Sequence, residues 1–179
     1  MIELSAKTPC AGLLPFETGS MSLRELDPVP ITSIMPLEGQ QEATSAALKE
    51  ALGVALPEVG GSLKSGSAEV LWTGQNQFFL FGAEAPDMAA GVTDQSDSWT
   101  RVSLEGGRGA QVLARLCPVD CEALEAGDVI RSQIGHMSAI VICRAEGFEL
   151  MVFRAFASTL VHELEVVMNS IAAQDEIRD

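Results

Sequence analysis

The chain repeats one order of sequence signals, and this repetition restricts its possible folds more than any other feature. Leu-Glu-Gly triplets end two strand-like stretches, at residues 37–39 and 104–106, and lie 67 residues apart. Each triplet is followed by a helix-like segment and then by a β-hairpin pattern. A recurring order at a fixed offset is typical of internal duplication. We therefore expect an α+β fold with two strand–helix–hairpin–helix halves that share one sheet system and pack about a pseudo-twofold axis.

The individual elements are predicted from hydrophobic periodicity and from turn residues. Residues 99–106 alternate as a half-buried strand does, and Gly53 and Pro57 end the first helix. The last helix carries an apolar stripe at spacings of mostly three or four, formed by Phe156, Leu160, Leu164, Val167, Met168 and Ile171. The predicted elements are strands over 31–35 and 99–106, helices over about 40–52, 107–116 and 155–172, hairpins over 68–82 and 137–153, and a short helix or turn around 85–90.

The N-terminal residues differ from the rest in showing no clear periodicity. Residues 1–28 contain several Pro and Gly residues, which favour irregular structure. We expect an irregular arm over 1–28 and a single duplicated domain over 29–179, with halves at about 29–91 and 98–173.

The stretch "VTDQSDSW", residues 92–99, lies between the two predicted halves. Asp94 and Asp97 are candidate ligands of a hard cation or an acid–base pair. The sequence around these two residues lacks the central Gly and the terminal Glu of a calcium-binding loop. Asp, Ser and Gln also bond to nearby backbone amides and shape turns. The favoured interpretation is a connector that holds no metal.

Composition excludes several classes of partner. The net charge is −14, and the eleven Lys and Arg residues are scattered, which argues against nucleic acid and against an anionic membrane surface. No signal peptide is evident, and no apolar run approaches the length of a membrane span. We expect a cytoplasmic protein, in which Cys10, Cys117, Cys121 and Cys143 are reduced thiols.

Other candidate sites are weak. "CPVDC", residues 117–121, has no second Cys or His pair at a zinc-binding spacing. His162 belongs to the polar face of the last helix, and His136 precedes a buried strand. "EGGRG", residues 105–109, matches neither phosphate-binding fingerprint and favours a tight strand-to-helix turn, although Arg108 is a candidate anion contact.

The ordered strings "GVTDQSDSW", "VSLEG", "VLARLCPVD", "HMSAIVIC" and "FELMVFRAFASTLVHEL" together resemble the gamma subunit of heterotetrameric sarcosine oxidase. The resemblance runs from about Leu23 through nearly the whole remaining chain. It implies a fold related to the folate-binding module of the glycine-cleavage T-protein, which is itself an internal duplication.

The resemblance also implies partners and a reaction. In the family, the holoenzyme demethylates sarcosine to glycine with oxygen and passes the one-carbon unit to tetrahydrofolate. FAD, FMN, NAD and tetrahydrofolate are expected in the alpha and beta subunits, and zinc in the delta subunit. No cofactor, metal or catalytic residue is expected in this chain.

Two functional hypotheses remain open from the sequence. The first is an accessory subunit without activity of its own, whose arm wraps a partner through residues such as Leu13, Leu14 and Phe16. Deletion of that arm is then expected to weaken assembly more than it unfolds the core. The second is a stand-alone, folate-dependent transferase resembling the T-protein, with Asp94, Asp97 and Arg108 as candidate folate contacts.

Overall fold

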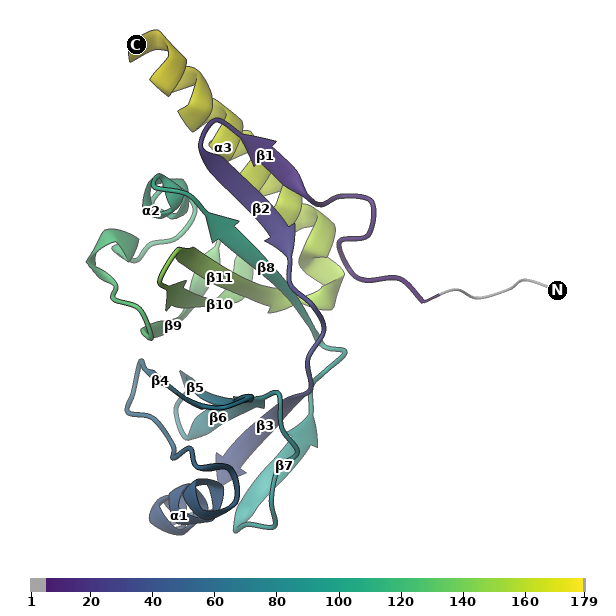
Figure 1. Ribbon diagram of the computed structural model, residues 1–179, viewed down its shortest axis with the longest axis vertical. Coiled ribbons are helices and arrows are strands. Elements are labelled where there is room, and N and C mark those ends of the chain that lie inside the picture. The colour runs from purple at the N-terminus through teal and green to yellow at the C-terminus, as the bar shows by residue number, and fades with distance from the viewer. Residues whose placement is uncertain (1–5, 179) are drawn as a thin grey trace, which may run out of the picture.

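The structure, a computed structural model, describes residues 6–178, which form two antiparallel sheets with helices on their outer faces (Figure 1). The six-stranded sheet has the order β1 (Phe16–Thr18), β2 (Met21–Glu25), β8 (Trp99–Glu105), β11 (Gly147–Phe153), β10 (Met137–Arg144) and β9 (Val129–Ile134). The five-stranded sheet has the order β4 (Ser62–Ser65), β5 (Ala68–Gly74), β6 (Gln77–Phe81), β3 (Ile31–Pro36) and β7 (Ala90–Asp94). The helical elements are α1 (Gln41–Leu52), α2 (Gly109–Leu113), α3 (Ala157–Arg178) and the 3₁₀ turns η1 (Cys121–Ala123) and η2 (Arg154–Phe156).

We call β3 to β7 with α1 the small half, and β1, β2 and β8 to β11 with α2 and α3 the large half. Alternation along the strands divides the buried side chains among three apolar clusters. In β10, Val141 faces the cluster shared with α2 and α3, whereas Ile140 and Ile142 face the other sheet. In β5, Val70 packs in the cluster beside α1 and Leu71 packs between the sheets. The layers are therefore helix, sheet, sheet, helix, and the near-continuous apolar strands result from burial on both faces.

The two sheets share one strand order. In the small half, adjacent strands follow the order β4, β5, β6, β3. In the large half, they follow the order β9, β10, β11, β8. Every neighbouring pair in both sets is antiparallel. A fifth strand extends each set, β7 beside β3 and β2 beside β8. Four strands therefore have the same spatial order in both halves, and the α+β class is confirmed.

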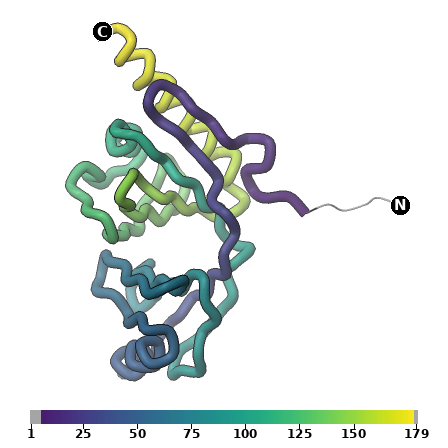
Figure 2. Tube along the Cα trace, viewed as in Figure 1, coloured from purple at the N-terminus to yellow at the C-terminus, as the bar shows by residue number. Residues whose placement is uncertain are grey.

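The stretch 92–99 is the connector that the sequence predicts. It includes the end of β7 in one sheet, a turn, and the first residue of β8 in the other. Figure 2 shows that the chain crosses between the halves twice at one place, once in indigo through residues 26–30 and once in teal through 95–98. The two crossings are bonded to each other, because the amide of Ile31 donates to Ser96 Oγ at 3.0 Å and the amide of Gln95 donates to the Ile31 carbonyl at 2.8 Å.

The prediction of an irregular arm over 1–28 is wrong for residues 16–25, which form β1 and β2; residues 1–5 lie outside the described part. β2 pairs with β8, and Met21 and Leu23 are buried in the core of the large half. Its partner lies about 80 residues away in the sequence, so local periodicity over five residues carries little signal.

Several other boundaries also differ from the predictions. The sheets are separate rather than one system. The segment predicted as a short helix or turn around 85–90 contains bends and no helix, and it leads into β7 (Ala90–Asp94), so the small half lacks the second helix. β4 and β9 lie in segments predicted as connections. α2 is shorter than the predicted 107–116, because the chain turns toward Cys117-Pro118 and Pro cannot continue a helix.

The last helix begins two residues later and extends further than predicted, to Arg178. Its buried face agrees with the predicted stripe at Leu160, Leu164, Met168 and Ile171, but Phe156 is exposed in η2.

We expect Leu164→Ala to lower the free energy of unfolding by roughly 2–5 kcal/mol, since the side chain is fully buried and its loss leaves a cavity. Glu165→Ala, one position along the helix and half-buried, should change it by less than about 0.5 kcal/mol. Urea unfolding of both variants measures the difference. Equal losses would show that the helix does not bury the face described.

Candidate functional site at the junction of the halves

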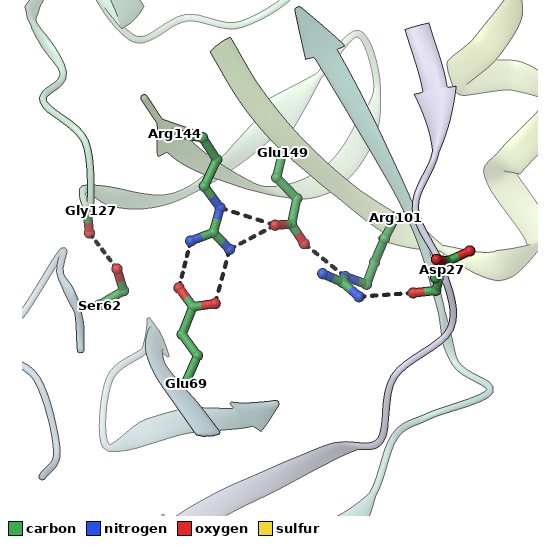
Figure 3. Close-up of polar contacts among 7 residues, drawn as sticks. All are labelled: Asp27, Ser62, Glu69, Arg101, Gly127, Arg144 and Glu149. Carbon is green, nitrogen blue, oxygen red and sulfur yellow. Dashed lines mark hydrogen bonds and ion pairs between the residues drawn. The ribbon is translucent and has the colours of Figure 1, made fainter. Parts of the chain in front are cut away.

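Four charged side chains form a network between the two sheets (Figure 3). Arg144 on β10 binds both oxygens of Glu69 on β5, with Nη1–Oε1 at 2.5 Å and Nη2–Oε2 at 3.2 Å. The same guanidinium donates to Glu149 Oε2 on β11, at 2.7 Å from Nη2 and 3.1 Å from Nε. Arg101 Nε on β8 donates to the other Glu149 oxygen at 2.7 Å. The network therefore links the small half to three strands of the large half.

Burial makes this network electrostatically strong. Glu69 and Glu149 are both buried, and the two Arg side chains are partly exposed. Burial alone lowers the pKa of Arg144, but hydrogen bonds and the negative charges of Glu69 and Glu149 outweigh it, so the pKa of Arg144 is raised. Each carboxylate lies beside a guanidinium, and removal of one partner leaves an uncompensated buried charge.

An apolar cluster lies beside the network and also joins the halves. Phe79 of the small half meets Trp99 of the large half edge-on, with ring centroids 5.5 Å apart, and Phe153 stacks on Trp99 at 4.5 Å. Arg101 lies over the Phe81 ring at 4.8 Å. Backbone bonds add to the junction at its β4–β9 end, where the Val129 amide donates to the Gly60 carbonyl at 2.7 Å. The junction is therefore a packed apolar core that also contains charged side chains.

A cleft of about 300 Å³ opens beside this junction. It lies where residues 6–9, both crossings between the halves, and Arg154 meet. Arg154 Nη2 donates to the Lys7 carbonyl at 2.9 Å, and Nη1 lies 3.8 Å from the exposed carboxylate of Asp97. Trp99 lines the cleft, is buried, and its Nε1 has no hydrogen-bond partner among residues 6–178. The cleft is therefore lined by both cations and carboxylates.

Asp94 serves the connector turn. Its Oδ1 accepts from the Ser96 amide at 2.9 Å and from Ser96 Oγ at 2.6 Å, and these two bonds lower the pKa of Asp94. The sequence predicts this kind of bond, in which an Asp side chain accepts from the backbone amide two residues later.

The structure does not bring the three candidate folate contacts together. Arg108 binds Asp175 near the end of α3, with Nη2–Oδ1 at 3.0 Å. The full length of β8 separates Arg108 from Asp97, and seven extended residues span roughly 23 Å. Only Asp97 lines the cleft.

Sequence reasoning did not identify the network, although a signal exists. Glu69 and Glu149 are the only charged residues in the largely apolar strands "AEVLWTG" and "GFELMVF". Charged residues are rarely buried without a partner, so a carboxylate within such a strand indicates a buried pair. Which Arg pairs with it depends on the packing of the two sheets.

The cysteines and histidines lie outside the junction. All four cysteines are free and buried. His136 and His162 are both exposed, on the β9–β10 turn and on α3. Within residues 6–178, no three His, Cys, Asp or Glu side chains are grouped so that they would hold a metal ion. None of the helices in that range is long and apolar enough to cross a membrane.

We expect the folded protein to resist thiol-specific reagents at pH 8. Burial, followed by the neighbouring Glu25, raises the pKa of Cys10 to about 12, and burial, followed by Cys117, raises that of Cys121 to about 12. The thiolate is the reactive form, so both groups stay unreactive until the pH approaches these values. A colorimetric titration should count four thiols in denaturant and close to none in the native protein. Rapid labelling of the native protein would contradict this burial.

Comparisons with known proteins identify relatives over most of the chain. No family model matches the sequence. A curated relative, the sarcosine oxidase subunit gamma of Corynebacterium sp. (strain U-96), is 30% identical over 175 aligned residues, which cover 87% of this chain and 83% of the relative.

A solved structure is similar in fold. The chain matches a chain of heterotetrameric sarcosine oxidase from Corynebacterium sp. U-96, in complex with pyrrole 2-carboxylate, with a TM-score of 0.80 and 24% identity, over 93% of this chain and 96% of the other. The sequence relationship and the shared fold agree with the ordered strings found in the sequence. The chain belongs to the family of sarcosine oxidase gamma subunits.

Proposed function

We propose that this chain is the gamma subunit of a heterotetrameric sarcosine oxidase and stabilises that assembly without an active site of its own. Its membership of the gamma-subunit family carries the proposal. The junction supports it, because a buried ion network and an apolar cluster fix two halves into one body that can present a constant surface. A subunit that binds only folded partners stabilises them by mass action.

The partners in this proposal are alpha, beta and delta subunits in the cytoplasm. FAD, FMN, NAD and tetrahydrofolate are then held by the alpha and beta subunits, and zinc by the delta subunit. Sarcosine oxidation needs an electron acceptor that side chains do not supply, so the chemistry falls to subunits that hold flavin.

The proposal is tested by co-expression of this chain with the other subunits. We expect co-elution in size-exclusion chromatography and oxygen uptake with sarcosine by the complex, and no uptake by this chain alone. Sarcosine oxidation by the isolated chain, or failure to co-elute with any partner, would contradict the assignment.

We further propose that the two halves, at about 29–91 and 98–173, arose by internal duplication and are related to the folate-binding module of the T-protein. The repeated strand order supports this origin. A superposition of the strands β3 to β6 on β8 to β11 tests it, and a mismatch in their arrangement would reject it.

A second candidate function is folate binding by this chain itself, as in a T-protein-like transferase. One observation favours it: Asp97 and Arg154 line the same cleft. Equilibrium binding of tetrahydrofolate to the isolated chain is the test. Arg154→Gln is expected to abolish binding, and Arg115→Gln is expected to leave it intact, because Arg115 lies outside the cleft and bonds to Ser170 and Gln174 of α3. Absence of binding would exclude this candidate.

A further inference from the structure

The exposed edges of the two sheets differ in how they are protected against pairing with another chain. Edge strands leave backbone N–H and C=O groups unpaired, and proteins usually block them with charges, Pro, irregularities or short length. β1 has three residues, with Glu17 paired to Arg24; β4 contains Lys64; and β9 contains Arg131. β7, with the sequence Ala-Gly-Val-Thr-Asp, has no basic residue, no Pro and no register shift against β3. Figure 1 shows it at the outer side of the small half.

The pairing of β7 with β3 determines which backbone groups face outward. The Leu37 amide donates to the Ala89 carbonyl and the Gln95 amide to the Ile31 carbonyl, and the register between them is regular. Since antiparallel pairs alternate, Gly91 and Thr93 bond to β3, whereas the N–H and C=O groups of Val92 and Asp94 point away from the sheet. This edge therefore presents the donor and acceptor pattern that an added strand needs.

Apolar side chains flank the same edge. Val92 is 46% exposed, and Met35 and Leu37 are exposed beside it. Gly91 pairs with Met35 and has no side chain, so a side chain on an added strand can reach across Gly91 to Met35. The edge thus offers apolar contact area on both faces of the sheet.

The segment that carries β7 contains only negatively charged side chains, and the nearby cation Arg154 lies 3.8 Å from Asp97, beyond the end of the strand. Residues 83–100 contain Glu84, Asp87, Asp94 and Asp97 and no Lys or Arg. Cations on a partner complement this field, and anions are repelled. A second copy of this chain would place the same carboxylates against one another, so homodimerisation through β7 is disfavoured.

We propose that β7 receives an extended, apolar segment of another oxidase subunit, flanked by Lys or Arg, as an additional strand of the five-stranded sheet. This inference rests on the proposed assembly function and names the surface that performs it. Strand addition gives affinity through main-chain hydrogen bonds and specificity through alternate side chains. Here the outward groups of Val92 and Asp94 supply the bonds, and Met35 and Val92 supply the apolar contacts.

The first test compares Val92→Lys with Leu63→Lys. Both residues lie on edge strands of the same sheet and are similarly exposed, at 46% and 44%. Val92→Lys should weaken assembly with the other subunits by about tenfold or more, a loss of about 1.4 kcal/mol, whereas Leu63→Lys should leave it unchanged. Thermal unfolding of both isolated variants checks that the fold is intact.

The second test uses the wild-type chain and does not depend on a variant folding. Residue-resolved hydrogen exchange should show the amides of Gly91 and Thr93 protected in the isolated chain, and those of Val92 and Asp94 protected only in the complex. Unchanged exchange at Val92 and Asp94 in an assembled complex would overturn the strand addition and leave the subunit assignment standing. Failure of the wild-type chain to assemble would overturn both the strand addition and the subunit assignment. If the isolated chain forms a dimer in which the amides of Val92 and Asp94 are protected, the strand added to β7 comes from a second copy of this chain and the proposal is wrong.

Discussion

Deletion of residues 1–28 should unfold the large half of the protein. The deletion removes β2, whose Met21 and Leu23 are buried in the core against α3 and the strands beside it. Loss of each buried aliphatic side chain costs roughly 2–5 kcal/mol, so the deletion should remove about 5 kcal/mol or more. That is a large share of the total stability of roughly 5–15 kcal/mol of an ordinary domain. Circular dichroism and urea unfolding of the truncated chain measure the loss.

Two point variants separate this effect from simple loss of chain length. Leu23→Ala, at a residue that is 0% exposed, should cost roughly 2–5 kcal/mol, whereas Leu13→Ala, at 42% exposed, should cost less than about 1 kcal/mol. For residues 16–25 we therefore expect loss of folding rather than a selective loss of assembly, because β2 is part of the core. A truncated chain that unfolds at the same urea concentration as the intact chain would show that β1 and β2 do not belong to the core.

Arg144→Ala should have the largest effect of any single charged substitution in the junction. It leaves Glu69 buried with no cation and removes one of the two partners of Glu149. Breaking a buried ion pair costs roughly 3–5 kcal/mol, and since Arg144 itself is about a third exposed we expect about 3 kcal/mol. Chemical denaturation measures the change in the free energy of unfolding.

Matched variants test whether burial is the cause. Arg24→Ala breaks an exposed pair with Glu17 and should cost less than about 1 kcal/mol. The double variant Glu69→Leu with Arg144→Leu removes both charges, keeps Glu149 paired with Arg101, and should be more stable than Arg144→Ala. A loss from Arg144→Ala no greater than that from Arg24→Ala would show that the network does not hold the halves together.

Much of the fold follows from local patterns. Both hairpins, α1, the buried stripe of α3 and the connector lie where periodicity and turn residues place them. These features are determined within a short window, by side-chain alternation, helical spacing and glycines that permit positive φ, as Gly53 does at the end of α1. The repeated order of these elements is also visible without coordinates.

Much less of the candidate site than of the fold can be predicted from the sequence. Asp94 was assigned correctly to the connector turn, because its partner Ser96 is two residues away. Glu69 and Arg144 are 75 residues apart, and Arg101 and Glu149 are 48 apart, so only the packing of the sheets brings them together. The cleft is likewise formed by four separate segments of the chain.

The sequence by itself determined the α+β class, the order of most elements, the connector between the halves and the relationship to the gamma subunits. The sequence determines these features because each of them depends on residues that are close together along the chain, or on the order of the sequence motifs. Only the tertiary structure decided that residues 16–25 are strands, that the halves have separate sheets, and that a buried ion network joins them. These features depend on pairings between distant segments, where the free energy comes from burial and hydrogen bonds that no local window contains.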